Sequence, residues 1–100
     1  MSTVRITPRA LADLEAIARW SLGTWGEVRT EAYLRALSDR FDWLAAQPLL
    51  GRDRGDVGAG YRSFPQGRHV IFYIAITEGI AIIGVPHQAM DTDSHFDEAP

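Results

Sequence analysis

The chain has 100 residues, of which 46% are hydrophobic and 10% aromatic, so it can build one modest core and no second one. Cysteine and lysine are both absent, which excludes disulfides, thiolate metal sites and a lysine nucleophile or general base. The formal net charge of −3 argues against wholesale electrostatic binding of nucleic acid, although residues 50–70 hold four arginines and only two aspartates.

The N-terminal half predicts a short strand followed by a helical hairpin. Apolar and polar residues alternate over 3–6, which is typical of a strand. Thr7 and Pro8 suit the N-cap and the first turn of a helix, and Gly23 is expected to end that helix. A second helix is predicted over about 27–46. Because the connection between them is short, the two helices must run antiparallel.

Apolar residues recur at three- and four-residue steps along both helices, as the buried face of an amphipathic helix requires. In the first helix the expected buried face consists of Leu11, Leu14, Ile17, Ala18 and Ser21 or Leu22. In the second helix it consists of Val28, Ala32, Leu34, Leu37, Phe41, Leu44 and Ala45.

The C-terminal half predicts three strands after a glycine-rich loop. They are expected at 61–64, 69–77 and 80–85, and the turns at 65–67 and 78–79 are short enough to make an antiparallel meander. In the middle strand, alternation assigns one set of side chains to the core beneath the helices, namely Val70, Phe72, Ile74 and Ile76. The opposite, open face then receives His69, Ile71, Tyr73 and Ala75.

The expected fold is α+β, in the order β-α-α-β-β-β, with an antiparallel helical hairpin packed on one face of a small, mainly antiparallel sheet. We expect a single domain over residues 1–96 and a disordered tail over 97–100. The N-terminus lacks a signal-peptide pattern, and the apolar run at 70–76 is too short to span a bilayer. A cytoplasmic protein without membrane contact is therefore expected.

The open face of the sheet carries the candidates for chemistry. They are Arg62, Arg68, His69, Tyr73, Ile82 and Gly84, with His87 and Asp91 just beyond the last strand. Cleavage of RNA needs a base, an acid and a cation for the phosphorane charge. His69 and His87 could be the acid–base pair, Tyr73 a third proton donor, and Arg62 or Arg68 the phosphate clamp. The alternative is that these residues form only the polar rim of a hairpin.

Other residue clusters give weaker signals. The metal-ligand types His87, Asp91, Asp93 and His95 have spacings of 4, 2 and 2, which match no established zinc or calcium pattern, so no metal and no cofactor is expected. Arg52 and Arg54 could form a phosphate- or acid-binding arm, or a solvated loop neutralised by Asp53 and Asp56.

The tryptophans of the hairpin leave two interpretations open. Trp20 falls off the Leu11–Leu14–Ala18 stripe and could present an apolar surface to a partner. Alternatively, Trp20 and Trp25 simply close the helical hairpin.

Nearly the whole chain, from Val4 to Phe96, resembles the ParE-type toxins of bacterial type II toxin–antitoxin modules, within the RelE/ParE superfamily. The resemblance lies in the order and spacing of "ITPRALADLEAIARW", "WGEVRTEAYLRAL", "LAAQPLLGRDR", "GYRSFPQGRHVIFY" and "VPHQAMD". It implies a cytoplasmic toxin held inactive in a hetero-oligomer with a ParD-like antitoxin, which itself binds the operator DNA. It also implies inhibition of DNA gyrase without enzymatic activity, whereas the RelE branch cleaves mRNA.

The last strand departs from the pattern of the family. Gly84 and Ala89 stand where family members usually carry arginines, and Pro86 replaces an apolar residue. Pro86 lacks a backbone donor and therefore suits only an edge or the end of a strand. These changes leave open an attenuated module that only binds antitoxin, besides the gyrase inhibitor and a metal-independent endoribonuclease that uses His69, His87, Arg62 and Tyr73.

Two surfaces are expected to carry recognition. The antitoxin is expected to bind an apolar and arginine-lined surface, made of Leu14, Trp20, Trp25, Tyr33, Arg62, Arg68 and His69. The cellular target is expected to contact a basic set, made of Arg52, Arg54, Arg62, Arg68 and His87. Direct binding of nucleic acid by this chain alone is not expected.

Overall fold

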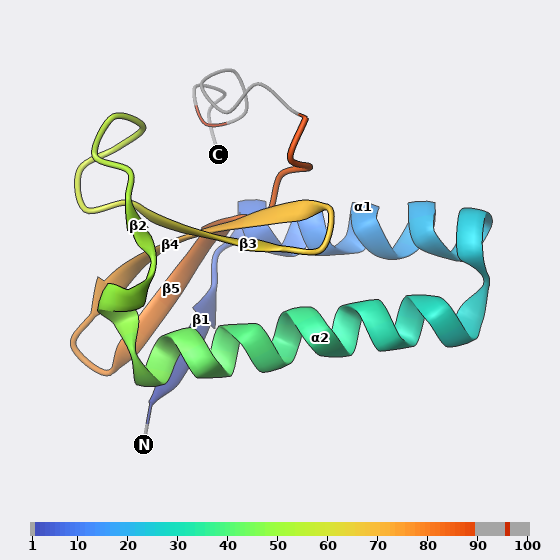
Figure 1. Ribbon diagram of the computed structural model, residues 1–100, viewed down its shortest axis with the longest axis horizontal. Coiled ribbons are helices and arrows are strands. Elements are labelled where there is room, and N and C mark those ends of the chain that lie inside the picture. The colour runs from blue at the N-terminus through green and yellow to red at the C-terminus, as the bar shows by residue number, and fades with distance from the viewer. Residues whose placement is uncertain (1, 90–95, 97–100) are drawn as a thin grey trace.

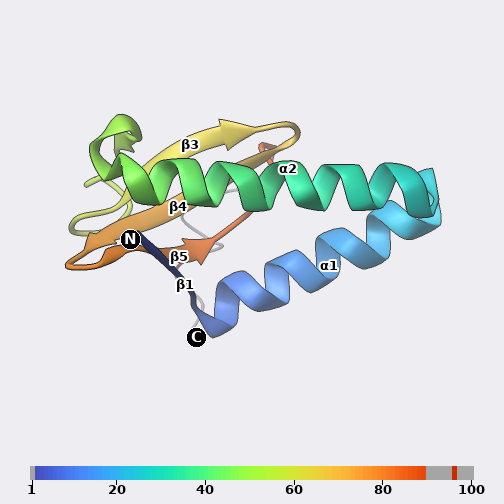
Figure 2. The same ribbon diagram turned by 90° about the horizontal axis from the view of Figure 1, so that it is seen from below.

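The computed structural model describes residues 2–89 and 96. Two antiparallel helices cover one face of a five-stranded sheet, and the end of the hairpin that joins them projects beyond the sheet (Figure 1, Figure 2). The elements are β1 (Thr3–Ile6), α1 (Pro8–Trp25), α2 (Glu27–Ala46), the 3₁₀ turn η1 (Pro48–Leu50), β2 (Arg52–Asp53), β3 (Arg62–Gln66), β4 (His69–Ile76) and β5 (Gly79–Gly84).

The sheet has the order β1-β5-β4-β3-β2. β1 pairs with β5 in parallel, and every other pair is antiparallel. The α+β class, the hairpin on the sheet and the β3–β4–β5 meander are therefore confirmed. β2 was not predicted because its two residues lie in a charged, glycine-rich loop without apolar alternation. The predicted turn at 65–67 is also corrected, because Pro65 and Gln66 belong to β3 and the chain reverses at Gly67, whose φ is 59°.

α1 begins as predicted and ends later than predicted. The hydroxyl of Thr7 accepts a hydrogen bond from the Ala10 amide and donates one to the Ile82 carbonyl, so the N-cap also fixes the helix to β5. Gly23 stays inside the helix, where one glycine costs only about 1 kcal/mol. Gly26 ends it instead, because its φ of 87° lies where residues with a side chain are strained.

The buried faces of the helices are narrower than predicted. In α1 the buried residues are Ala10, Ile17 and Ser21, whereas Leu11 and Leu22 are exposed. In α2 the predicted core residues Leu37, Phe41, Leu44 and Ala45 are buried, but Val28 is 84% exposed and Ala32 is exposed. Val28 lies in the first turn of α2, at the end of the hairpin that projects past the sheet (Figure 1).

The predicted facing of β4 was wrong. Ile71 and Tyr73 point into the core beneath the helices, and Phe72 lies on the opposite side, here called the outer face. Both sets of alternating residues are apolar, so alternation alone could not set the phase of this strand. Tyr73 can be buried because its hydroxyl is hydrogen-bonded inside the protein. It accepts from the Gly51 amide and donates to the Pro48 carbonyl. Ile82 likewise belongs to the core and not to the open face.

The outer face is partly covered by Phe96. Its ring packs at 5.0 Å from Phe72 and 5.7 Å from Tyr61, measured between ring centroids. A Cβ atom on Gly84 would come within 2.8 Å of this ring, so the glycine leaves the space that Phe96 fills. The predicted disordered tail at 97–100 and the candidates Asp91, Asp93 and His95 lie outside the described residues.

Candidate functional site

Five aromatic rings form a continuous series of edge-to-face contacts across the junction of the helices and the sheet. Ring centroids are 5.3 Å apart for Trp20–Trp25, 5.4 Å for Trp25–Tyr33, 5.6 Å for Tyr33–His69 and 5.4 Å for His69–His87. This set of five side chains, here called the aromatic chain, connects the end of α1 to α2, to β4 and to the segment after β5. Edge-to-face packing is the favoured geometry for such rings.

A β-bulge brings the two histidines together. β4 and β5 pair in one register up to Tyr73↔Ile82, and the next pair is Phe72↔Gly84, so Ile83 is an extra residue. The shifted register continues past the end of β5, where His69 pairs with His87 in an isolated antiparallel bridge. The pairing is completed by hydrogen bonds from the Val70 amide to the Pro86 carbonyl and from the Gln88 amide to the Arg68 carbonyl, each 2.9 Å long.

The hydroxyl of Tyr33 fixes the orientation of His69. It accepts a hydrogen bond from the Arg68 amide at 3.0 Å and lies 2.6 Å from Nδ1 of His69 and 3.3 Å from the Gln66 carbonyl oxygen. The hydroxyl has a single proton, and the shorter distance places it toward Nδ1. Nδ1 of His69 is therefore engaged with the Tyr33 hydroxyl, and Nε2 is the ring nitrogen left for other partners.

The surroundings of His69 favour its neutral form. Burial lowers the pKa of His69 below its usual value of 6.5, and the charges of His87 and Arg68 act in the same direction, while Asp13 opposes them. His87 is exposed, and its Nδ1 accepts a hydrogen bond from the Ala89 amide at 3.1 Å. The pair therefore combines a half-buried imidazole, whose surroundings favour the neutral form, with an exposed one.

Two guanidinium groups lie over the indole ring of Trp25. The Cζ atom of Arg29 is 4.4 Å from the centroid of the ring and that of Arg68 is 5.5 Å away. Such contacts contribute roughly 0.5–1 kcal/mol each at exposed sites. Among the residues that the structure describes, no carboxylate forms an ion pair with either guanidinium. The middle of the aromatic chain is thus a positively charged surface.

A pocket of about 230 Å³ opens beside the two histidines. This hollow is here called the histidine pocket. One wall is a stripe of α1, and the other is formed by the start of β4 and the segment after β5. The lining residues are Asp13, Ala16, Ile17, Trp20, Arg68, His69, Val85, Pro86 and His87. Val85 and Pro86 are buried, whereas Trp20 is 52% exposed. The pocket is therefore an apolar hollow with charged groups at its rim.

The structure brings together five of the seven residues predicted to bind antitoxin: Trp20, Trp25, Tyr33, Arg68 and His69. Leu14 is only half-buried and packs against the core. Arg62 begins β3, at the end of the strand away from the turn that contacts Tyr33. There its Nη1 donates to the Gly51 carbonyl at 2.8 Å and to the Leu49 carbonyl at 3.4 Å. Trp20 and Trp25 contact each other at the hairpin end, as the closing interpretation expects, while Trp20 remains half exposed and its role toward a partner stays a prediction.

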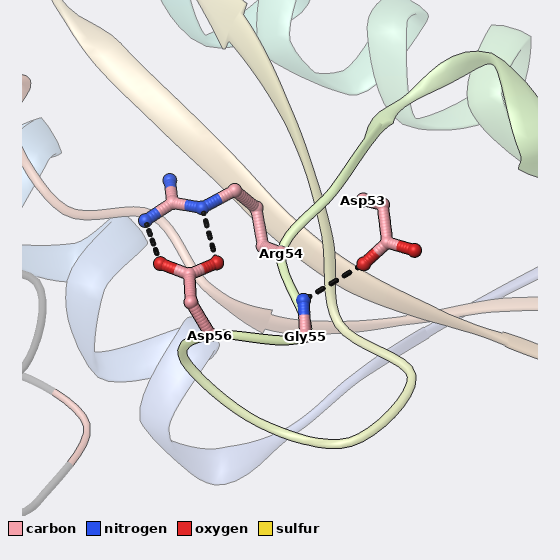
Figure 3. Close-up of polar contacts among 4 residues, drawn as sticks. All are labelled: Asp53, Arg54, Gly55 and Asp56. Atoms are coloured by element: carbon pink, nitrogen blue, oxygen red, sulfur yellow. Dashed lines mark hydrogen bonds and ion pairs between the residues drawn. The ribbon is translucent and has the colours of Figure 1, made fainter.

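The predicted target-binding set is split between two places. Arg68 and His87 line the histidine pocket, whereas Arg52, Arg54 and Arg62 lie near β2. Figure 3 shows that Arg54 is held by Asp56 through two hydrogen bonds of 3.0 Å, while the Asp53 carboxylate accepts the Gly55 amide at 2.8 Å. The hydrogen bond to Arg54 lowers the pKa of Asp56. Arg54 is thus engaged within its own loop.

The four residues of the alternative catalytic set are not assembled. His69 and His87 meet, but Tyr73 lies in the core, where its hydroxyl donates to the Pro48 carbonyl at 2.7 Å and accepts from the Gly51 amide at 2.8 Å. Burial raises the pKa of this phenol, which makes it a weaker acid. Arg62 is bound to backbone carbonyls of the same loop. The predicted third proton donor and one of the two predicted clamps are therefore structural.

Arg29 and Ile17 are site residues that the sequence analysis did not select. Arg29 lies in the first turn of α2, and Trp25 is the last residue of α1, so the break at Gly26 brings the guanidinium over the indole ring. Ile17 was assigned to the core, and it also lines the histidine pocket, on the same stripe of α1 as Asp13 and Trp20. For Ile17 the helical spacing from Asp13 and Trp20 was a signal, whereas the contact of Arg29 with Trp25 depends on how the chain turns between the two helices.

Residues 2–89 and 96 contain neither a cluster of metal ligands nor a membrane-spanning helix. No group of three or more histidine, aspartate or glutamate side chains there is placed to hold a metal ion. No helix within the same residues combines the length and the apolar character that crossing a bilayer requires.

Comparisons with known proteins agree with one another. The family described as "ParE toxin of type II toxin-antitoxin system, parDE" matches residues 4–92. Toxin ParE1 of Mycobacterium tuberculosis H37Rv is 39% identical over 92 residues, which cover 91% of this chain and 94% of that protein. Toxin ParE1 of Caulobacter vibrioides is 35% identical over 96 residues, which cover 96% and 99% respectively.

A solved structure, the chromosomal ParDE toxin–antitoxin system from P. aeruginosa, has the same fold. Its chain superposes with a TM-score of 0.72 at 18% identity, over 87% of this chain and 96% of the other. At that identity the likeness concerns the fold, whereas the family match and the relatives extend over most of the sequence. The chain therefore belongs to the ParE toxin family of type II toxin–antitoxin systems.

Proposed function

We propose that the protein is the toxin of a ParDE-type module, that a ParD-like antitoxin neutralises it by covering the aromatic chain, and that DNA gyrase is the target of the released toxin. One observation supports the aromatic chain as the surface that binds the antitoxin. The aromatic chain is continuous from α1 to the segment after β5, and two guanidiniums lie over its centre. Aromatic and arginine side chains are the types that are enriched in protein interfaces and their hot spots.

Inhibition by binding rather than by chemistry is the second part of the proposal. Two of the residues needed for an acid–base mechanism at the sheet, Tyr73 and Arg62, are engaged in contacts that hold the loop at residues 48–51. The gyrase target rests on membership in the ParE family and on the resemblance described above. Residues Arg68 and His87 are the proposed target contacts, and Arg52 adds an exposed cation near β2.

Growth and supercoiling assays test the proposal in sequence. Overexpression of the protein alone should arrest growth, and coexpression of the ParD-like product of the adjacent gene should restore growth and yield a co-purifying complex. The purified protein should inhibit supercoiling by gyrase and trap cleaved DNA. A protein that arrests growth without any effect on gyrase would contradict the target and leave the antitoxin assignment intact.

Ribonuclease activity is the second candidate, favoured by the contact between His69 and His87 at 5.4 Å. If the pair works as acid and base, His69→Ala and His87→Ala should each abolish growth arrest and the cleavage of ribosome-bound mRNA. Growth arrest that persists in both folded variants would eliminate this candidate.

An attenuated module that only binds antitoxin is the third candidate. It is favoured by Gly84, which provides no cation and whose space on the outer face is occupied by Phe96. This candidate requires a stable complex with the antitoxin together with normal growth and unchanged gyrase activity on overexpression. Growth arrest by the wild-type protein would exclude it.

A further inference from the structure

We infer that the histidine pocket receives one aromatic or branched apolar side chain of the antitoxin, and that a carboxylate next to this anchor pairs with Arg68. This inference rests on the proposed function, because it takes the antitoxin as the occupant. It adds a specific recognition pocket and the chemistry that the partner must present there.

The pocket has the size and the walls for an apolar anchor. Its volume of about 230 Å³ exceeds the roughly 150 Å³ that suffices for benzene in an engineered apolar cavity. Its floor is formed by Ile17, Val85 and Pro86, which are buried, and the half-exposed indole of Trp20 stands at one end. An apolar side chain from a partner would bury Trp20 further and displace solvent from the hollow.

The charges at the rim of the histidine pocket determine which way round a bound partner segment lies. Asp13 and Trp20 lie on one face of α1 seven residues apart, which corresponds to about 10 Å along a helix. The Asp13 carboxylate marks one end and accepts the Val85 amide at 2.8 Å. Arg68 lies at the other end with Trp25 and Arg29. A partner carboxylate is therefore repelled at the Asp13 end and attracted at the Arg68 end.

The histidines limit what the partner can be. His69 already uses Nδ1 for the Tyr33 hydroxyl, and His87 uses Nδ1 for the Ala89 amide, so each imidazole offers only Nε2 to a ligand. Arg68 lines the same pocket and can only donate, and Nε2 of His87 is a donor because its Nδ1 accepts the Ala89 amide. This pattern favours a segment with an acidic residue beside the anchor over one with a basic residue.

A substitution that places a side chain of this protein in the histidine pocket tests whether an antitoxin side chain binds there. Ala16 is exposed and lines the pocket, so Ala16→Phe places a ring in it without changing the core. Affinity for the coexpressed ParD-like antitoxin should fall by about 10- to 100-fold, the range expected for the loss of one buried apolar side chain. The matched control is Ala12→Phe, since Ala12 is exposed on the same helix and lies outside the pocket lining. Arg68→Gln should weaken binding by about two- to fivefold.

A small probe tests the chemistry independently of the antitoxin. Titration of the full chain with 3-phenylpropionate, followed by NMR, should shift the Ala16 and His87 amides and the Trp20 indole signal. The uncharged 3-phenylpropanamide should bind more weakly, and Ala16→Phe should abolish the shifts. Equal binding of the two probes, or shifts that survive in Ala16→Phe, would overturn the inference.

The outcomes separate this inference from the proposed function. If the wild-type protein binds the antitoxin and folded Ala16→Phe binds it equally well, the pocket anchor is wrong and the function stands. If the wild-type protein does not bind the antitoxin at all, both fall. Far-ultraviolet circular dichroism of each variant establishes that it is folded, and Arg68→Gln provides a surface change that leaves the core untouched.

Discussion

At the scale of single residues, two tyrosine hydroxyls each attach a loop to the scaffold. Tyr73 reaches from β4 to the loop at residues 48–51, and Tyr33 reaches from α2 to the turn between β3 and β4. In both cases the hydroxyl accepts a backbone amide, and glycine stands where a Cβ atom would overlap the phenol ring, at Gly51 and at Gly67. The close approach of ring and backbone explains why these two positions lack a side chain.

Tyr73→Phe should destabilise the protein by about 1–3 kcal/mol, because it leaves the Gly51 amide and the Pro48 carbonyl without their partner. Urea unfolding monitored by tryptophan fluorescence measures the change. Tyr61→Phe is the control, since the Tyr61 ring packs against Phe96 and Gly58 while its hydroxyl makes no hydrogen bond among the described residues. Equal stability of the Tyr73 variant and the wild-type protein would contradict the structural role of this hydroxyl.

Gly84→Ala should destabilise the wild-type protein more than it destabilises a Phe96→Ala background. The added Cβ atom would lie 2.8 Å from the Phe96 ring, which must then move away from Phe72. A double-mutant cycle of unfolding free energies should therefore give a coupling of about 0.5 kcal/mol or more between the two sites. Additive effects would show that Phe96 does not occupy the space beside Gly84 in solution.

At the scale of elements, the bulge at Ile83 determines what β4 and β5 present at their ends. It shifts the register by one residue, and the segment after β5 continues the ladder although Pro86 interrupts the strand. His69 consequently faces His87, and both line the pocket beside α1. The same hairpin without a bulge would place Pro86 opposite His69.

Burial of His69, aided by the charge of His87, should make stability depend on pH between about 7.5 and 5.5. Burial lowers the pKa of His69 in the folded protein, so the unfolded chain binds more protons than the folded one in this range. The free energy of unfolding is therefore highest above pH 6.5, the pKa of the unfolded chain, and it decreases as pH falls toward the lower pKa of the folded protein. The groups that act on this ring are His87, Asp13 and Arg68, besides the Tyr33 hydroxyl. Unfolding free energies should fall over this range in the wild-type protein.

His69→Gln is the test variant for this dependence, because an amide does not titrate. Its unfolding free energy should change less between pH 7.5 and 5.5 than that of the wild-type protein. The carboxylates titrate mainly below this window, so they contribute little to the difference. A variant with the same pH profile as the wild-type protein would show that another group is responsible.

At the scale of the whole molecule, the projecting hairpin and the sheet together form one recognition surface. The aromatic chain runs from the end of α1 through Tyr33 of α2 to His69 of β4, so it joins the helical layer to the sheet. Its two guanidiniums concentrate positive charge on a protein with a formal net charge of −3. A partner with acidic residues is therefore guided to this place.

Binding of the antitoxin should weaken as ionic strength rises, and it should do so less steeply in the double variant Arg29→Gln/Arg68→Gln. Exposed charge pairs are screened over a Debye length of about 8 Å at physiological salt. Affinity measured at low and high sodium chloride gives both slopes. Arg35→Gln is the control, because Arg35 is an exposed cation of α2 outside the aromatic chain. Equal slopes in all three proteins would contradict the electrostatic role of the pair over Trp25.

The sequence by itself determined the order of the elements apart from η1 and β2, the ends of α2, the N-cap of α1 and the β3–β4–β5 meander. These features depend on local physics: Thr7 and Pro8 are residues preferred at the start of a helix, and short turns bring neighbouring strands together. The family resemblance also came from the sequence, because the order of motifs along the chain carries it.

Only the tertiary structure decided the phase of β4 and the assembly of the site. With apolar residues on both faces, the position of Tyr73 depended on partners in the distant loop around Pro48, which alternation cannot reveal. The contact between His69 and His87 depended on one extra residue at Ile83, and the aromatic chain joined residues of four separate segments. Local patterns fix elements because their interactions span a few residues, whereas register, facing and ring contacts are chosen by packing between segments far apart in the sequence.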